Sequence, residues 1–362
     1  MKTFVRHAMM ALTIAAVCQT GLALAEDFYW VSSDGKAASP APAEKAAAPA
    51  QSPCTSGCQA ACCEESCSSC CCSMGCDDCP CRGIVAFAGL DSFKGISDGT
   101  YPSNFGAVTG LNGAIPVPGL SDYGVNWQLG MSYGIYDIDG SASPASASAN
   151  CQQQVFVTTG FFHKADCDHR LSFGLVYDWM INSEWGSLGI DPTLGQWRGQ
   201  VEYALSGCNS VGLWATHRDL GSNINVGTIA PAFVSTRAID QACLFWHHKF
   251  CCGADSFVWA GVPDRTRIEG TEGGSLGDWM IGANVQVPLT DTLALYANGS
   301  YFRPSASAGG KAAVDQGYDV SMGVVWYFGG NAMSHSLNGK CGLPYMNVAN
   351  NSTFLVDQAP VF

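Results

Sequence analysis

Cysteine is the residue type in this chain with the most chemistry to offer, and most of it lies in one short segment. Residues 62–81 read CCEESCSSCCCSMGCDDCPC, which places nine cysteines in twenty positions. Thiols at this density can bind soft metal ions as thiolates, or join to one another and to other proteins as disulfides. The outcome depends on the compartment that the segment reaches and on the elements attached to it.

The cysteine-rich segment spans residues 54–82, and its spacing argues against a zinc finger or ribbon. Sites of that kind need two well-separated C-x2-C pairs around a small fold, and this pattern is absent. A thiolate cluster of the metallothionein kind is chemically possible, but it competes poorly with disulfide formation in an oxidising compartment. We therefore predict no cofactor and keep three alternatives: cross-linking beyond the segment, an internal disulfide knot, and a metal cluster. The cysteines concerned are Cys54, Cys58, Cys62, Cys63, Cys67, Cys70, Cys71, Cys72, Cys76, Cys79 and Cys81.

The N-terminal residues predict export from the cytoplasm. Lys2 and Arg6 precede an apolar run, and Ala23-Leu24-Ala25 gives the small-x-small pattern that signal peptidase cleaves, so we expect a signal peptide over residues 1–25. Residues 26–53 are rich in Ala, Pro and Ser and predict a disordered linker. Export places the thiols where they tend to be oxidised.

Composition excludes several classes of protein. Charged residues make up 13% of the chain, against about 25% in an ordinary soluble domain. After the predicted signal peptide no apolar run approaches the length of a transmembrane helix. The net charge of −13 argues against a nucleic-acid partner, which would need a basic face.

Long runs of alternating apolar and polar residues recur within residues 83–330, separated by turns and loops. In YGVNWQLGMSYGI, from Tyr123 to Ile135, the large apolar residues occupy every second position, which is typical of a β-strand. Several such runs reach the roughly 9–11 residues that a strand needs to cross a bilayer. With a weaker strand over residues 105–115, the pattern predicts an antiparallel transmembrane β-barrel of about 12 strands (10–12).

The lengths of the connections predict the orientation of this barrel. Short turns, such as residues 164–169 and 250–253, alternate with long loops, such as residues 181–194 and 219–236. Outer-membrane barrels have short periplasmic turns and long external loops, so both ends of the barrel segment are expected on the periplasmic side. The alternative is a soluble, secreted β-sandwich whose cysteine cluster binds metal or cross-links a matrix, because alternation alone does not distinguish lipid from a protein core.

The barrel interpretation assigns each face of the strands a role. Aromatic residues at the ends of outward faces should form the two girdles at the membrane interfaces. The expected girdle residues are Trp179, Trp197, Trp279, Tyr301, Tyr318, Trp326 and Phe328. The expected lumen-facing residues are Asn126, Gln128, Asp178, Arg198, Glu202, Asn284, Gln286 and Asp319.

Five cysteines outside the cysteine-rich segment are candidates for disulfides with it. Four of them fall in short turns and the fifth in the C-terminal tail, residues 331–362, so all share the expected periplasmic rim with the segment. They are Cys167, Cys208, Cys251, Cys252 and Cys341. An odd number of cysteines in the segment requires at least one partner outside it if all are oxidised. The expected partners of the protein are therefore outer-membrane lipid and, through disulfides, envelope proteins or a second copy of the chain.

Three stretches resemble a known group of proteins. They are LDSFKGISDGTYPSNFGAVTGLNGAIPV, NWQLGMSYGIYDIDG and LPYMNVANNSTFLV. On these the chain resembles bacterial outer-membrane β-barrel proteins, and more narrowly an uncharacterised group from planctomycete-type bacteria. The resemblance implies a barrel in the outer membrane of a bacterial envelope and implies no activity. The tail that carries the third stretch is expected to pack at the periplasmic mouth.

Two motifs of catalysis, the phosphate loop and HExxH, are absent from the sequence. His247 and His248 are adjacent and would point to opposite faces of a strand, so they cannot chelate one metal together. We therefore expect a non-enzymatic barrel, either a porin-like channel or a structural envelope protein.

Overall fold

The fold was determined as a computed structural model. It describes residues 83–95, 103–137, 151–165, 169–186, 188–206, 208–227, 232–250, 253–264, 277–303, 317–328, 332 and 343–361. The signal peptide, the linker and the cysteine-rich segment lie outside these residues and stay predictions.

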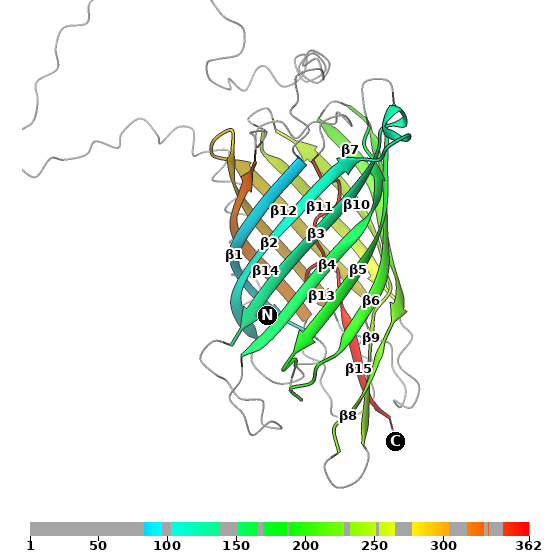
Figure 1. Cartoon of the computed structure of the whole chain (residues 1–362), viewed down its shortest axis with the longest axis vertical. Coiled ribbons are helices and arrows are strands. Elements are labelled where there is room, and N and C mark those ends of the chain that lie inside the picture. Colours follow the sequence, from blue (N-terminus) through cyan, green and yellow to red (C-terminus); the bar gives the residue numbers. More distant parts are fainter. Residues whose placement is uncertain are drawn as a thin grey trace, which may run out of the picture. The chain divides into compact units, whose positions relative to one another are not determined.

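A single antiparallel sheet closes on itself to form a barrel of twelve strands (Figure 1). Each strand pairs with its neighbour in the chain, and β1 pairs with β14 to close the ring, with Val85 opposite Tyr327. The strands are β1 (Gly83–Lys94), β2 (Asn104–Pro116), β3 (Val125–Tyr136), β4 (Gln152–His163), β5 (Leu171–Ser183), β6 (Thr193–Ala204), β7 (Asn209–Leu220), β10 (Gln241–Lys249), β11 (Asp255–Pro263), β12 (Trp279–Pro288), β13 (Leu293–Arg303) and β14 (Gly317–Tyr327).

The predicted barrel of twelve strands is confirmed, including the weak strand that became β2. Alternation explains it, because successive side chains point to opposite faces of a strand. In β5 every second residue from Ser172 to Asn182 is buried, and the residues between them are exposed or half-buried. The sandwich alternative is wrong, since the strands form one closed sheet and not two packed ones.

The two rims of the barrel differ as the sequence predicted. Short turns of a few residues join β4 to β5, β6 to β7, β10 to β11 and β12 to β13, while longer connections lie at the other rim. We call these the short-turn rim and the long-loop rim. A single turn of 3-10 helix, η5 (Ser121–Tyr123), lies between β2 and β3. Among the described residues no helix is long and apolar enough to cross a membrane.

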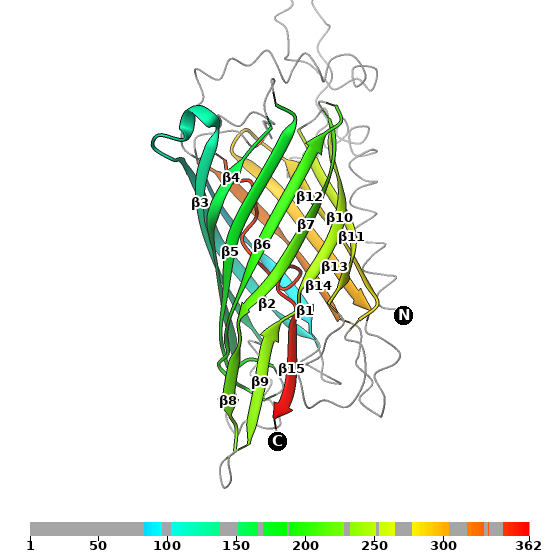
Figure 2. The ribbon, with the colours of Figure 1, turned by 90° about the vertical axis from the view of Figure 1, so that its right-hand side faces the viewer.

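A second, three-stranded sheet lies beyond the long-loop rim (Figures 1 and 2). Its strands β8 (Ser222–Asn225) and β9 (Phe233–Ala238) come from the connection between β7 and β10, which the sequence predicted only as a long loop. Its third strand, β15 (Val356–Val361), comes from the C-terminal tail and pairs with β9, with Val356 opposite Ala238.

The path of the tail corrects one expectation. The chain leaves β14 at the short-turn rim, yet β15 lies at the opposite rim, and residues 343–355 pass through the barrel (Figure 2, red). The described part of the tail therefore does not pack at the short-turn rim alone, where it was expected. It runs through the lumen, where side chains of the polar inner wall form hydrogen bonds with its backbone.

Candidate functional site

The lumen is lined by polar side chains that the alternation of the strands turns inward. All eight residues expected there lie inside the barrel, and six of them are buried while Asn284 and Gln286 are half-buried. Arg198 and Asp178 form an ion pair, with 2.8 Å between Arg198 Nε and Asp178 Oδ2. Both side chains are at least 94% buried, so each charge depends on the other.

The first half of the tail is held by one side of the wall. Met346 is fixed at both backbone atoms: its N–H donates to Gln128 Oε1 (3.1 Å), and its carbonyl accepts from Gln128 Nε2 (3.0 Å) and Asn112 Nδ2 (2.9 Å). Arg198 donates to the carbonyl of Asn347 at 2.8 Å. Residue Gly130 of the wall makes this close approach possible, since a Cβ there would lie 2.5 Å from Val348.

A tight turn at Asn350–Thr353 spans the lumen, and we call it the crossbar. Asn350 Oδ1 accepts from the backbone N–H of Ser352 (3.2 Å) and of Thr353 (3.1 Å), a side-chain-to-backbone turn typical of asparagine. The residues of the turn then bond to strands around the whole ring. The bonds are Asn351 Nδ2 to Gln154 Oε1 of β4 (3.0 Å), Gln196 Nε2 of β6 to Thr353 O (2.9 Å), Gln241 Nε2 of β10 to Thr353 O (3.1 Å), and Ser352 Oγ to Asp319 Oδ2 of β14 (2.6 Å).

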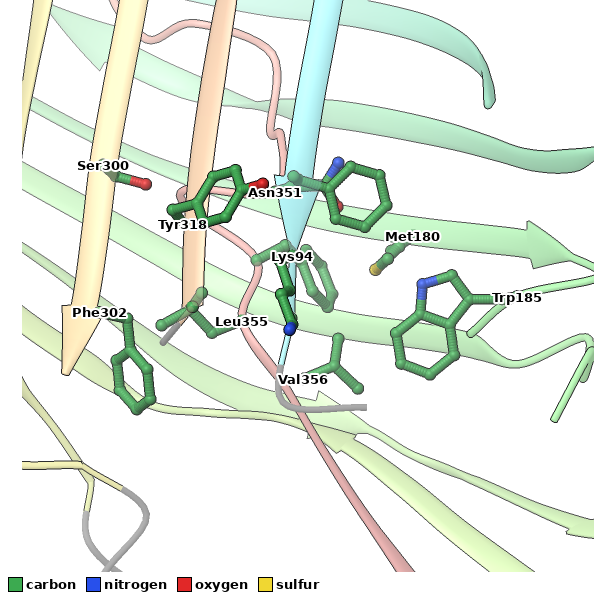
Figure 3. A pocket seen from close by; sticks show the side chains of 13 residues that line it. Lys94, Met180, Trp185, Ser300, Phe302, Tyr318, Asn351, Leu355 and Val356 are labelled. Carbon is green, nitrogen blue, oxygen red and sulfur yellow. The ribbon is translucent and has the colours of Figure 1, made fainter. Parts of the chain in front are cut away.

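Beyond the crossbar, apolar side chains seal the long-loop end. Phe354 is 2% exposed and packs against Phe156 with ring centroids 6.2 Å apart. Figure 3 shows Val356 and Leu355 of the tail between Trp185 and other apolar groups of the rim. The space left among these residues is a cavity of only about 30 Å³.

On the short-turn side of the crossbar the lumen stays open as a chamber of about 360 Å³ beside the tail. His247 lies in its wall between two carboxylates, with Nδ1 2.6 Å from Glu202 Oε1 and Nε2 2.5 Å from Asp255 Oδ1. Tyr345 of the tail donates to Glu202 Oε2 at 3.1 Å. Lys164, in the turn after β4, also lines the chamber, and burial together with nearby Lys249 lowers its pKa to about 7.

The expected girdle residues all occupy outward positions. Trp197, Trp279, Trp326 and Phe328 are exposed, and they pack in pairs with neighbouring rings: Trp326 stacks on Phe328 with centroids 5.8 Å apart. Trp279 lies 5.5 Å from Tyr301, ring to ring. Trp179 and Tyr318 are half-buried.

The structure describes one of the five disulfide candidates. Cys208, in the turn between β6 and β7, is disulfide-bonded. Cys151 and Cys243 are free thiols. The other four candidates, Cys167, Cys251, Cys252 and Cys341, lie outside the described residues. The whole cysteine-rich segment lies outside them as well.

Sequence reasoning missed two features of the lumen. The crossbar residues Asn350 to Thr353 form an Asn-Asn-Ser-Thr turn, but nothing in the sequence shows that the turn lies inside a barrel. The contact of His247 with Glu202 and Asp255 was also missed, although the inward parity of Cys243 and His247 in one strand gave a signal. Within the described part of the chain, no cluster of three or more His, Cys, Asp or Glu residues fits a metal ion.

A family model matches residues 83–356, which covers the barrel and the tail up to the start of β15. Its description is "Family of unknown function (DUF6666)". The chain belongs to this family. No curated protein matches the chain.

Solved structures with a similar fold are distant in sequence from this DUF6666 protein. A chain from a study of the in-meso crystallization of membrane proteins is 7% identical, with 76% of this chain and 100% of that chain covered and a TM-score of 0.42. Outer membrane phospholipase A from Escherichia coli is 9% identical (67% and 95% covered, TM-score 0.38). The TodX monoaromatic hydrocarbon channel, as a deletion mutant, is 11% identical (67% and 90% covered, TM-score 0.38). At these scores the likeness carries no argument about activity.

Proposed function

We propose that this DUF6666 protein is a non-enzymatic outer-membrane barrel that serves as a closed structural element of the bacterial envelope. The outward face supports the location. It carries exposed apolar side chains such as Leu90, Leu129 and Leu244, and the charged outward residue Asp219 lies near the end of its strand. A closed sheet leaves no unpaired strand edge, and a band of this kind is what lipid requires.

The crossbar is the single observation that favours a closed element over a porin-like channel. Polar inner walls can hydrate a pore, but here the tail uses those side chains as partners for its own backbone. The apolar seal beyond it leaves space for about one water molecule. A solute that enters from the short-turn side therefore meets a closed end.

Two truncations test this role. The intact protein in planar bilayers is expected to show no steady conductance. A chain that ends before Val356 keeps the crossbar and should stay silent, whereas a chain that ends before Leu343 should conduct. Heat-dependent migration on gels confirms in each case that a barrel has folded. Steady conductance of the intact chain would contradict the closed role.

The short-turn rim is the proposed periplasmic side, where the cysteine-rich segment would cross-link the barrel to other envelope components. The short turns support this orientation by analogy with outer-membrane barrels, and disulfide-bonded Cys208 lies at this rim. The test is non-reducing against reducing gel analysis of envelope fractions, with thiols alkylated at lysis. Ladders of high mass that collapse on reduction would support cross-linking, and a monomer under both conditions would exclude it.

A further inference from the structure

Two carboxyl groups meet inside the barrel at the seam that closes it. Asp91 of β1 and Asp319 of β14 both line the chamber, and the register makes them diagonal neighbours, with Asp91 opposite Ser321 and Phe93 opposite Asp319. Their carboxyl groups lie within hydrogen-bonding reach of each other. Asp91 is 5% and Asp319 2% exposed, so the two acids share one nearly dry site. We call them the acid pair.

One oxygen of each acid accepts hydrogen bonds, and the other oxygen accepts none. Tyr136 of β3 donates to Asp91 Oδ2 at 2.6 Å. Ser352 of the crossbar and Asn298 of β13 donate to Asp319 Oδ2 at 2.6 and 3.2 Å. Donors of this kind favour the ionised form of a carboxyl group. Asp91 Oδ1 and Asp319 Oδ1 are buried and accept no hydrogen bond, so each has room for a further partner.

Among the described residues, no basic side chain forms an ion pair with the acid pair. Lys164 follows β4 and Lys249 ends β10, both at the short-turn rim, whereas Asp319 is the third residue of β14 from the long-loop rim. Arg198 is paired with Asp178. Two buried carboxylates in contact repel each other, and a cation between them removes that repulsion.

The groups around the acid pair offer oxygen and no nitrogen or sulfur ligand. Asn284 of β12 lies opposite Asn298, and Asn284 Oδ1 is likewise buried without a donor. Carboxylates, amide carbonyls and water are the ligands of Ca²⁺, which takes about six to eight oxygens in a flexible arrangement. Only two acidic ligands meet here, so an amide oxygen and water must complete the shell. The adjoining chamber of about 360 Å³ has room for that water.

We propose that the acid pair binds one Ca²⁺ ion through Asp91 Oδ1 and Asp319 Oδ1, with Asn284 Oδ1 and water from the chamber as further ligands. The ion joins β1 to β14 at the seam and, through Ser352, stabilises the crossbar. The inference goes beyond the closed structural role and does not depend on it. Binding is measured on detergent-solubilised protein, so its failure leaves the conductance result untouched.

The test is calorimetric titration of chelator-treated, full-length protein with CaCl₂ at constant ionic strength. The unaltered chain is expected to bind Ca²⁺ with a dissociation constant of about 1 mM or lower. Asp91→Asn and Asp319→Asn keep the size of the side chain and should each weaken this binding by about tenfold or more. The matched variant Asp219→Asn alters an outward carboxyl that accepts from Tyr177, and it should not change the affinity.

Denaturant titration of the same proteins gives a second readout. Ca²⁺ should raise the unfolding midpoint of the unaltered chain and of Asp219→Asn, because a ligand of the folded state stabilises it, and should leave both acid-pair variants unchanged. Absence of Ca²⁺ binding to the unaltered chain would overturn the proposal and would mean that the two acids share a proton only. Unchanged affinity in Asp91→Asn or Asp319→Asn would also overturn it, by placing the ion elsewhere in the chain. Either variant alone provides this comparison if the other does not fold.

Discussion

The two halves of the lumen share one wall and are filled in opposite ways. On the long-loop side the tail is packed into an apolar cluster with Phe156, Trp185 and Leu194, and about 30 Å³ is left. On the short-turn side the same tail leaves about 360 Å³ open beside charged and aromatic groups. The contrast shows that a polar inner wall does not by itself make a pore, because a segment of the same chain can take its hydrogen bonds.

The largest expected effect comes from the ion pair that supports the tail between the two halves. Arg198→Ala leaves the fully buried Asp178 without its cation and releases the carbonyl of Asn347. Loss of one partner of a buried pair costs about 3–5 kcal/mol of unfolding free energy. Denaturant titration in detergent micelles measures it. The matched control, Arg218→Ala, breaks a pair with Asp264 that is about a quarter exposed and should cost at most ~1 kcal/mol; similar losses in both variants would contradict the prediction.

Truncation of one aromatic ring in each half tests the difference in packing. Phe354→Ala should cost about 3–5 kcal/mol because it opens a cavity in the apolar seal. Phe257→Ala should cost about 1 kcal/mol, since that half-buried ring borders space that is already open. The same titration compares them. Equal costs would mean that the chamber is packed as tightly as the seal.

A smaller effect is expected at the crossbar. Ser352→Ala removes the hydroxyl that donates to Asp319 and leaves that buried carboxyl short of one donor, at a cost of about 1–3 kcal/mol. Bilayer recordings should then show brief openings that the intact chain lacks. Thr290→Ala, in the exposed turn between β12 and β13, serves as the control and should stay silent. If both variants opened equally often, the openings would not depend on the crossbar, and the prediction would be wrong.

The smallest predicted effect is a dependence of stability on pH that belongs to the chamber alone. Burial and Lys249 lower the pKa of Lys164 to about 7, so between pH 7 and the ordinary lysine range near 10.5 the unfolded chain binds more protons than the folded one. Its contribution to stability therefore rises with pH through this window. Lys164→Gln should remove that rise, as seen in unfolding free energies at pH 6.5 and 9. An unchanged slope would show that Lys164 is not the group responsible.

The barrel could be predicted from the sequence because the information is local. The closed sheet is predicted from the period of two, the strand lengths and the lengths of the connections. The same period predicts that residues such as Gln128 and Asp178 face the lumen. The contents of the lumen could not be predicted, because they depend on pairs far apart in the chain. Met346 forms a hydrogen bond with Gln128, which lies 218 positions away in the sequence. No sequence pattern around either residue indicates the other as its partner. The sheet beyond the long-loop rim was missed for the same reason, since β9 receives its partner from the tail.

The enclosed tail also constrains the order of assembly. Its bonds before the crossbar go to β2, β3, β4 and β6, whereas the seam that closes the ring joins β1 to β14. If the seam closed first, β15 would have to be threaded through a finished ring and past the site of the crossbar. Docking of the tail on the open sheet before the seam forms avoids this topological barrier, so the last step of folding would be the closure of a ring around a strand already in place.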